Sequence, residues 1–280
     1  MSIELPPGTA DYSDRNVEAT NRQLGTIILG FGSVLVIVLL VLNILLNQLV
    51  WLIPVSVEQQ LGRLVVPVFE AQADPSPTQD ALNQLLKHLE ANLPPKSLEN
   101  RDYQVLYIPE DTVNALAIPG DRIVIYQGLL ADMDSENELA MVLGHELGHF
   151  ANRDHLRGLG RAVLLQIVFT SLFGDLGSLG AIAVSGAETL TTAQFSQRQE
   201  AKADAFGLKL LDRTYGQVYG ATDFFAELAK QPGRGLDFLS THPDPQKRVR
   251  NLEKLIRKEN YSIGEPTPLP PALQPGDLSS

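Results

Sequence analysis

A long uncharged segment near the N-terminus restricts the folds open to this chain more than any other feature. No charged residue occurs between Arg22 and Glu58, and residues 27–46 are almost wholly apolar. As a helix, this run can cross a hydrocarbon core of about 30 Å. A cleaved signal peptide is disfavoured by the long acidic leader and the lack of an A-x-A site after Leu46, and a buried core helix would usually keep a polar face. We therefore expect a transmembrane anchor at residues 25–53.

The arginines that flank this segment predict its orientation. Arg15 and Arg22 precede it, and Arg63 follows it. Because positively charged residues stay preferentially on the cytoplasmic side, we expect the N-terminus in the cytoplasm. The rest of the chain would then lie on the outer side, in a periplasm or a lumen, and contact the membrane through residues 26–50.

Composition along the chain predicts one globular domain between less regular segments. Residues 1–24 are expected to form an N-terminal tail. Residues 54–77 are expected to form a linker, because their end mixes Pro, Ser and Asp. The domain itself should span residues 78–260. The Pro-rich residues 261–280 are expected to be disordered.

Periodicity predicts the fold class of this domain. Leucines at helical spacing indicate a helix at residues 78–92, with His88 off the apolar stripe and therefore at the surface. Segments rich in β-branched and aromatic residues then predict a small antiparallel sheet, with strands at residues 103–108, 113–118 and 122–126. From Ser135 to about residue 260 the pattern is helical. The expected fold is therefore α+β and mostly helical.

Two further apolar segments lie within the helical part. Residues 162–173 and 179–184 are separated by Gly174 and Asp175, and each is too short to span a membrane. We expect a helical hairpin that serves as core, as a lid over the site or as a membrane-facing patch.

Composition also excludes several functions. The formal net charge of -11 argues against nucleic acid as the main partner, because phosphate binding needs clustered Lys and Arg. The basic residues 247–258 are typical of the solvated face of a helix. The chain has no cysteine, which excludes a disulfide scaffold, a thiolate metal site and a cysteine nucleophile. A bound metal must therefore be held by His, Asp or Glu.

One short motif predicts such a metal site. The segment MVLGHELGHF contains HExxH, in which His145 and His149 are four residues apart and share one helix face. Neutral imidazoles bind zinc well. Glu146 lies about 100° further round the helix, where it can act as general base toward a water bound to the metal. Ser135 and Glu138 form an S-x-x-E capping box that predicts where this helix begins.

Two residues compete as the third ligand. His155 has the spacing of HExxHxxGxxH, but Asn152 replaces the turn glycine, and every Met precedes His155, so no Met-turn can follow it. The alternative is Glu200, which shares a helix face with Asp204 in FSQRQEAKADAFG. Asp204 could then accept the free ring N–H of a ligand histidine. Without the HExxH motif, the two carboxylates would be taken as an ordinary exposed pair.

These motifs resemble those of the HtpX-like and CAAX-prenyl-protease-like zinc metalloendopeptidases, metallopeptidase family 48, in the gluzincin group. The segment HELGHFANRDH is similar to the metal helix of the family, and SQRQEAKAD to its S-R-x-x-E-x-x-A-D block. The resemblance implies one Zn²⁺ per chain, Glu200 as third ligand and Asp204 as its companion. Gln197 stands where the family has Arg.

Two more segments extend the resemblance. STHPDPQKR is similar to the Ser-His-Pro block, which implies that His242 and Arg248 stabilise the oxyanion of the tetrahedral intermediate. Asp244 and Pro245 also suit a helix start, so His242 could merely precede a helix. The segment VNALAIPGDRIVIYQGLL is similar to the strand before the metal helix, which implies substrate contacts at Asn114 and Ala115.

The expected function is hydrolysis of peptide bonds in polypeptide substrates by a membrane-anchored zinc metalloendopeptidase. Prenyl-protein proteases of this family have many membrane spans, whereas one is expected here. The sequence therefore favours membrane or envelope protein quality control over the processing of lipidated C-termini. Two alternatives stay open: a non-catalytic, chaperone-like module that keeps the zinc, and a latent hydrolase whose metal is blocked by His242 or by the apolar hairpin.

Overall fold

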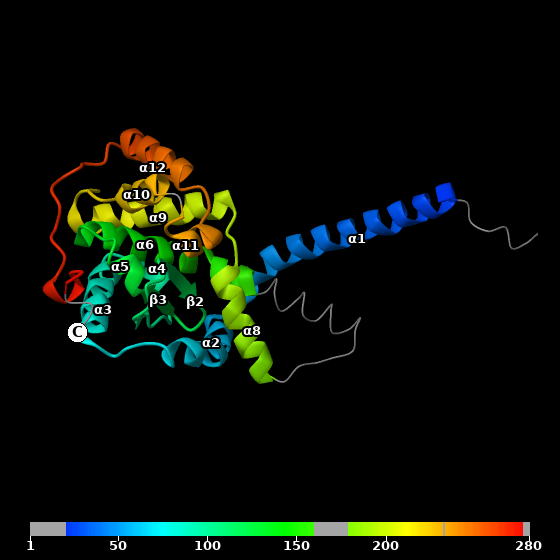
Figure 1. The fold of residues 1–280 in the computed structure, drawn as a ribbon, viewed down its shortest axis with the longest axis horizontal. Coiled ribbons are helices and arrows are strands. Elements are labelled where there is room, and N and C mark those ends of the chain that lie inside the picture. The colour runs from blue at the N-terminus through cyan, green and yellow to red at the C-terminus, as the bar shows by residue number, and fades with distance from the viewer. Residues whose placement is uncertain (1–20, 160–178, 232, 277–280) are drawn as a thin grey trace, which may run out of the picture. The chain divides into compact units, whose positions relative to one another are not determined.

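The computed structural model describes residues 21–159, 179–231 and 233–276 (Figure 1). Two compact units are present, Met1–Asn47 and Gln48–Ser280, and each is described by itself. The larger unit has an α+β fold, as expected. Its elements in chain order are η2 (Val50–Leu52), α2 (Val55–Glu70), α3 (Pro77–Glu90), α4 (Pro95–Leu98), β1 (Gln104–Ile108), β2 (Ala115–Ile118), β3 (Arg122–Tyr126), α5 (Gln127–Leu130), α6 (Glu136–Asn152), α8 (Leu179–Thr192), α9 (Gln197–Tyr215), α10 (Asp223–Lys230), α11 (Leu236–Thr241), α12 (Pro245–Glu259) and η3 (Pro271–Leu273).

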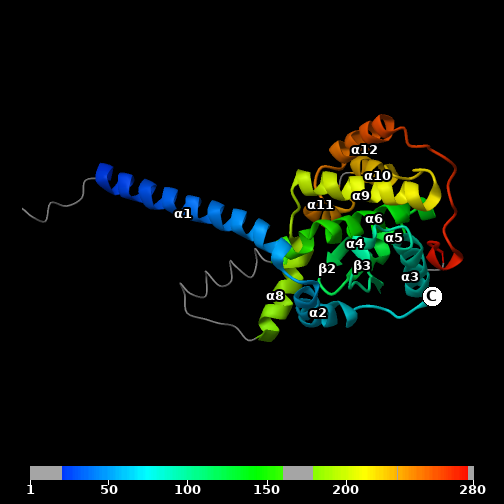
Figure 2. The same cartoon turned by 180° about the vertical axis from the view of Figure 1, so that it is seen from behind.

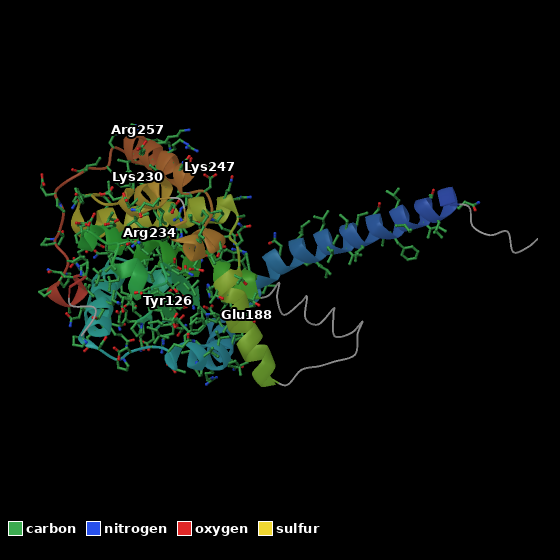
Figure 3. All side chains as sticks on the ribbon, viewed as in Figure 1. Tyr126, Glu188, Lys230, Arg234, Lys247 and Arg257 are labelled. Carbon is green, nitrogen blue, oxygen red and sulfur yellow. The ribbon has the colours of Figure 1, made fainter. Side chains whose placement is uncertain are left out.

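The smaller unit consists, in its described part, of most of helix α1 (Asn21–Leu49). Within this helix Gln23–Leu42 has a mean hydropathy of 2.7 and none of it is buried. Figure 3 shows mainly carbon atoms along its side chains. By length and composition this segment can cross a membrane.

The sheet is mixed, which corrects the expected antiparallel arrangement. The strand order is β1-β3-β2, in which β2 pairs antiparallel with β3 and β1 pairs parallel with it. Gly120 and Asp121, both with positive φ, make the tight turn between β2 and β3. The chain from β1 to β2 makes no such hairpin, so β1 pairs with β3 rather than with its neighbour in sequence.

Both faces of this sheet are covered by helices. Alternate strand residues such as Val105 and Ile123 face the core built by α3 and α6, whereas Leu106 and Val124 face α2 and α8. Figures 1 and 2 show α6 between the sheet and α9, with α12 on the far side of α9. Basic side chains of α12, such as Lys247 and Arg257, lie at the surface (Figure 3).

Helix α2 replaces most of the linker expected at residues 54–77. Its residues Val65, Val66 and Phe69 are buried against the second face of the sheet. Gly62 meets Gly120 so closely that a Cβ on Gly62 would lie 2.3 Å from the Cα of Gly120. The segment is therefore part of the domain, because a sheet with two apolar faces needs a cover on each.

The Pro-rich residues 261–276 are also packed, contrary to the expected disorder. Leu269 and Leu273 are buried in the main core. The backbone N–H of Glu136 donates to Thr267 O (2.9 Å), and Thr78 Oγ1 donates to Ala272 O (3.0 Å). The segment thus ties the starts of α3 and α6 together.

The expected apolar hairpin lies largely outside the described residues. Its described part belongs to α8, where Ala187 and Leu190 are buried against the sheet.

A buried ionic cluster joins α2 to the residues that follow α6. Glu58 of α2 is fully buried and pairs with Arg101 and with His155 Nε2 (2.8 Å). Arg101 also pairs with Asp121 (2.6 Å). Burial alone would raise the pKa of Glu58, but His155 and Arg101 outweigh it and lower that pKa to about 2.

We predict that Glu58→Gln lowers the melting temperature of the full chain in detergent by on the order of 10 °C, because it leaves His155 buried without its anion and Arg101 with Asp121 alone. Glu70→Gln, an exposed carboxylate on the same helix, serves as the matched control. Because the folded-state pKa is lowered, the stabilisation by Glu58 is complete above a pH of about 4.5 and is lost as the pH falls toward about 2. Equal melting temperatures for both variants would contradict the role of this cluster.

Candidate metal centre and active site

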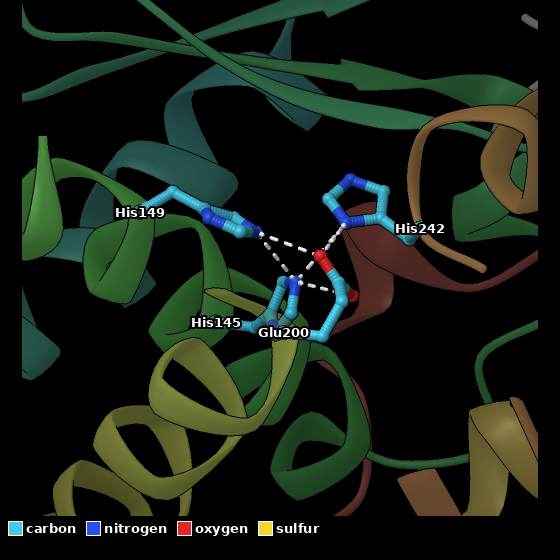
Figure 4. Close-up of side chains that lie close together, drawn as sticks. All are labelled: His145, His149, Glu200 and His242. Carbon is cyan, nitrogen blue, oxygen red and sulfur yellow. Dashed lines mark hydrogen bonds and ion pairs between the residues drawn. The ribbon is translucent and has the colours of Figure 1, made fainter. Parts of the chain in front are cut away.

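Two helices and one loop bring four donor groups to a common point (Figure 4). His145 and His149 come from α6, Glu200 from the first turn of α9, and His242 from the end of α11. Their ligand atoms all lie within 4.8 Å of one another, and all four side chains are buried. Of the candidates for third ligand, the structure brings Glu200 to the histidines.

The distances fit a metal ion. His145 Nε2 lies 3.0 Å from His149 Nε2 and 3.2 Å from His242 Nδ1, and Glu200 Oε1 lies 3.2 Å from His242 Nδ1 and 3.5 Å from His149 Nε2. In a tetrahedral zinc site, bonds of about 2.0–2.1 Å separate neighbouring donors by about 3.3 Å. The donor set is nitrogen and carboxylate oxygen, which suits zinc.

The charges around this point also favour a cation. Four buried carboxylates, those of Glu146, Asp154, Glu200 and Asp204, lie in or beside the site, whereas the guanidinium groups that pair with them are those of Arg157 and Arg248. Among the described residues, these carboxylates therefore exceed the guanidinium groups by two charges, which a divalent ion would neutralise.

The histidines respond differently to their neighbours. Burial, together with the nearby charge of Arg248, lowers the pKa of His145 to about 4, so this imidazole is a neutral donor. Burial also opposes a charge on His149, but the carboxylates of Asp154 and Glu200 outweigh it and raise its pKa to about 10. The carboxylates around His149 thus favour a positive charge at this position, either a proton on the ring or a metal ion bound to it.

Glu146 lies beside the donor set without a hydrogen-bond partner among the described residues. It is fully buried, and among the described residues neither carboxylate oxygen has a hydrogen-bond partner. His242 Nε2 is 3.7 Å from Glu146 Oε1 and is likewise unpaired. Buried polar atoms without partners are rare in folded proteins, and they often mark catalytic groups.

Two carboxylates orient the histidines of α6. Asp204 Oδ1 accepts from His145 Nδ1 at 2.9 Å, at the position expected from sequence. Asp154 Oδ2 accepts from His149 Nδ1 at 3.1 Å and was not anticipated. Its place five residues after His149, in HELGHFANRDH, was the available signal. Such partners fix the tautomer and direct Nε2 toward the ion.

Arg248 is held by these acidic groups. Its Nη2 donates to Asp204 Oδ1 (2.6 Å), its Nη1 lies 3.0 Å from Glu200 Oε2, and its guanidinium carbon is 3.8 Å from the ring centre of Phe225. The guanidinium thus contacts the carboxylates of α9, and its Nη2 lies 3.4 Å from His145 Nε2, one of the donor atoms. Its expected part in stabilising an oxyanion stays a prediction.

Aromatic rings line the other side of the donor set and were not anticipated either. Phe195 stacks on His149 with ring centres 4.1 Å apart, and Phe238 stacks on His242 at 4.5 Å. The backbone N–H of Phe195 donates to Thr241 O (2.9 Å), which joins the loop before α9 to the end of α11. These contacts hold His242 beside the other three donor groups.

His155 lies away from the donor set. It is buried against Glu58 and Phe150, so the metzincin alternative has no support in the geometry. The start of α6 also differs in detail: Ser135 accepts from Glu138 N–H (3.2 Å), but the Glu138 carboxylate accepts from Asp134 rather than from Ser135. A complete capping box occurs instead at Ser196 of α9.

The edge strand β2 presents backbone groups to one side. Tyr126 N–H donates to Asn114 O (3.2 Å), so the backbone of Asn114 faces β3. Because antiparallel pairing alternates, the backbone groups of Ala115 and Ala117 point away from β3, to the side on which no strand of the described residues pairs with β2, and all four residues of β2 are buried. The side chain of Asn114 accepts the Ala115 N–H (2.9 Å). Of the two expected substrate contacts, only Ala115 has its backbone at this edge.

Comparisons with known proteins agree with the site. A model of peptidase family M48 matches residues 78–256. The chain is 32% identical to the mitochondrial metalloendopeptidase OMA1 of Arabidopsis thaliana over 172 residues, 59% of this chain and 34% of that protein. It is 35% identical to the metalloprotease LoiP of Escherichia coli (strain K12) over 156 residues, 54% of this chain and 61% of that protein.

A third relative is the Beta-barrel assembly-enhancing protease of Yersinia pestis, 29% identical over 214 residues, 69% of this chain and 42% of that protein. The chain thus spans between about a third and three fifths of the length of these relatives. The family match covers more than half of the chain and includes all four donor residues. The protein therefore belongs to peptidase family M48.

Proposed function

We propose that this protein is a membrane-anchored, zinc-dependent endopeptidase. The observation that carries the proposal is the convergence of four buried donor groups beside Glu146, a carboxylate without a hydrogen-bond partner among the described residues. The relatives named above support the class, since they are a metalloendopeptidase, a metalloprotease and a protease.

In this proposal His145, His149 and Glu200 hold the ion, because they stand on two well-packed helices. A zinc ion there would polarise the scissile carbonyl and acidify a water molecule. Glu146 takes a proton from that water and delivers it to the leaving amine. His242, through its free Nε2, stabilises the negative charge that develops on the carbonyl oxygen.

Arg248 and Asp204 act at one remove from the substrate. Asp204 fixes the ring of His145, and Arg248 holds the carboxylates of Asp204 and Glu200. The contacts of Arg248 support this role, and the direct oxyanion contact implied by the family resemblance stays a prediction.

The substrate would bind as an extended strand along β2. The outward C=O of Ala115 and the outward N–H and C=O of Ala117 offer main-chain hydrogen bonds that depend little on the sequence bound, whereas the Ala115 N–H is held by Asn114. Such recognition fits a protease with many polypeptide substrates. We propose a role in membrane or envelope protein quality control. Gln23–Leu42 would anchor the protein in the membrane, with the domain on the outer side.

A latent form of the same enzyme is the second candidate, and a specific contact favours it. His242 Nδ1 lies within 3.2 Å of both His145 Nε2 and Glu200 Oε1, where it can serve as a fourth ligand and occupy the position that water needs. His242→Ala would then raise activity and weaken metal binding. A variant with unchanged activity and unchanged metal affinity would exclude latency through His242.

We predict that Glu200→Ala loses stoichiometric zinc and that Glu146→Gln keeps it. Peptidase activity falls by about 10²–10⁴-fold in Glu146→Gln, because the general base is lost while the ligands stay. The checks are metal analysis and cleavage of casein by the full chain in detergent. Cleavage that survives Glu146→Gln would contradict the assignment. A wild type that holds zinc and binds unfolded clients without cleaving them would favour the chaperone-like alternative.

We predict that Ala117→Pro lowers kcat/KM for peptides by about 5- to 10-fold, because one outward N–H donor is removed from β2. Proline is tolerated at an edge strand when its missing N–H faces away from the neighbouring strand. Zinc content equal to that of the wild type is the control for an intact site. Unchanged kcat/KM would show that substrate does not pair with this edge.

A further inference from the structure

The residue that ends α6 also holds the segment at the start of the domain. Arg153 Nη1 donates to Val50 O (2.6 Å) and to Ile53 O, and Nη2 lies 3.9 Å from Glu58 Oε2. Both carbonyls belong to the short turn before α2, which follows the apolar helix directly in sequence. The Arg153 side chain is mostly buried, with 12% of its surface exposed. The turn of the chain next to the membrane segment is therefore fastened to the end of the metal helix.

The backbone of Arg153 has a conformation that is unfavourable for a residue other than glycine. Its φ of 58° and ψ of 33° place it in the left-handed region, at the C-cap of α6. Helices usually have glycine at such a position, because a Cβ is unfavourable there. An arginine keeps the steric cost and adds a side chain that reaches two carbonyls. Strained backbone residues that make specific contacts cluster at functional sites, and Arg153 is one such residue.

The next residue connects this turn to both ligand helices. Asp154 is fully buried and accepts hydrogen bonds from His149 Nδ1 (3.1 Å) and Gln199 Nε2 (2.9 Å), as well as from Arg157. His149 is on α6, and Gln199 directly precedes the ligand Glu200 on α9. One carboxylate thus touches both helices that carry the donor set, and its direction is set by the left-handed turn at Arg153.

From this chain of contacts we propose that Arg153 is a positioning residue for the metal centre. It fixes the turn that aims Asp154 at His149, and it transmits the position of the Val50–Ile53 turn, beside the membrane segment, to the metal ligand. The inference rests on the proposed function in taking His149 as a metal ligand. Because it concerns the geometry of the ligand, it is tested by metal binding rather than by proteolysis.

The test is titration of the full chain in detergent with Co²⁺ at pH 7.5, read as affinity and as the visible absorption spectrum, which reports ligand geometry. Asp154→Ala is expected to weaken Co²⁺ binding by about 10- to 100-fold. Arg153→Ala is expected to weaken it by about 10-fold and to alter the spectrum. Arg153→Gly relieves the left-handed backbone and should show the same loss. Arg63→Ala, an exposed arginine on α2, is the matched control and should bind as the wild type does.

Transmission from the turn is tested with Pro54→Gly, which loosens the segment that presents the two carbonyls. We expect this variant to bind Co²⁺ more weakly than the wild type. The double variant Arg153→Ala, Pro54→Gly should bind Co²⁺ no more weakly than Arg153→Ala, since both substitutions act on the same contact between Arg153 and the Val50–Ile53 turn. Wild-type affinity and spectrum in Arg153→Gly would overturn the positioning role. A fully additive double variant, or an unaffected Pro54→Gly, would overturn the transmission. A wild-type protein that binds Co²⁺ and cleaves no peptide would contradict the proposed protease function. The comparison of Co²⁺ affinities between the variants and the wild type would still test the role of Arg153.

Discussion

The close contact between α6 and α9 is the constraint on which the site depends. A Cβ on Gly148 would lie 2.8 Å from the Cα of Ala203, and one on Gly207 would lie 2.9 Å from the backbone nitrogen of His145. Only small residues allow the two backbones to approach this closely. Side chains as short as histidine and glutamate can therefore meet between the helices, and HELGH needs its glycine for packing as well as its histidines for binding.

This contact gathers charges that must then be balanced in a buried space. The carboxylates of Glu146, Asp154, Glu200 and Asp204 all lie out of water, and Arg248 and Arg157 offset part of their charge. Burial of unpaired charge is costly, so the remaining negative charge favours a bound divalent cation. The network extends to the start of the domain, since α2 brings Glu58 to His155 and the turn before it accepts from Arg153.

The sequence was sufficient for what depends on local pattern and spacing. HExxH predicted the metal helix, and the periodicities predicted the fold class, α3 and the approximate strand positions. Asp154 and Phe195 could not be assigned, because their roles depend on a left-handed turn and on a loop contact that no periodicity reports. The sequence also failed to predict the parallel pairing of β1, the helix at residues 55–70 and the packing of residues 261–276. Each of these depends on an apolar surface built by residues far away in the sequence. Arg248 was found, but its direction is fixed by Asp204 and Phe225.

The central claim is that His145, His149 and Glu200 together hold zinc. X-ray absorption at the zinc edge of the loaded full-length protein tests it most directly, because it reports the number, distance and type of the ligands. We expect a four-coordinate shell of nitrogen and oxygen at about 2.0–2.1 Å, with imidazole scattering from two rings, or from three where His242 is bound. A six-coordinate oxygen shell without imidazole scattering would contradict it.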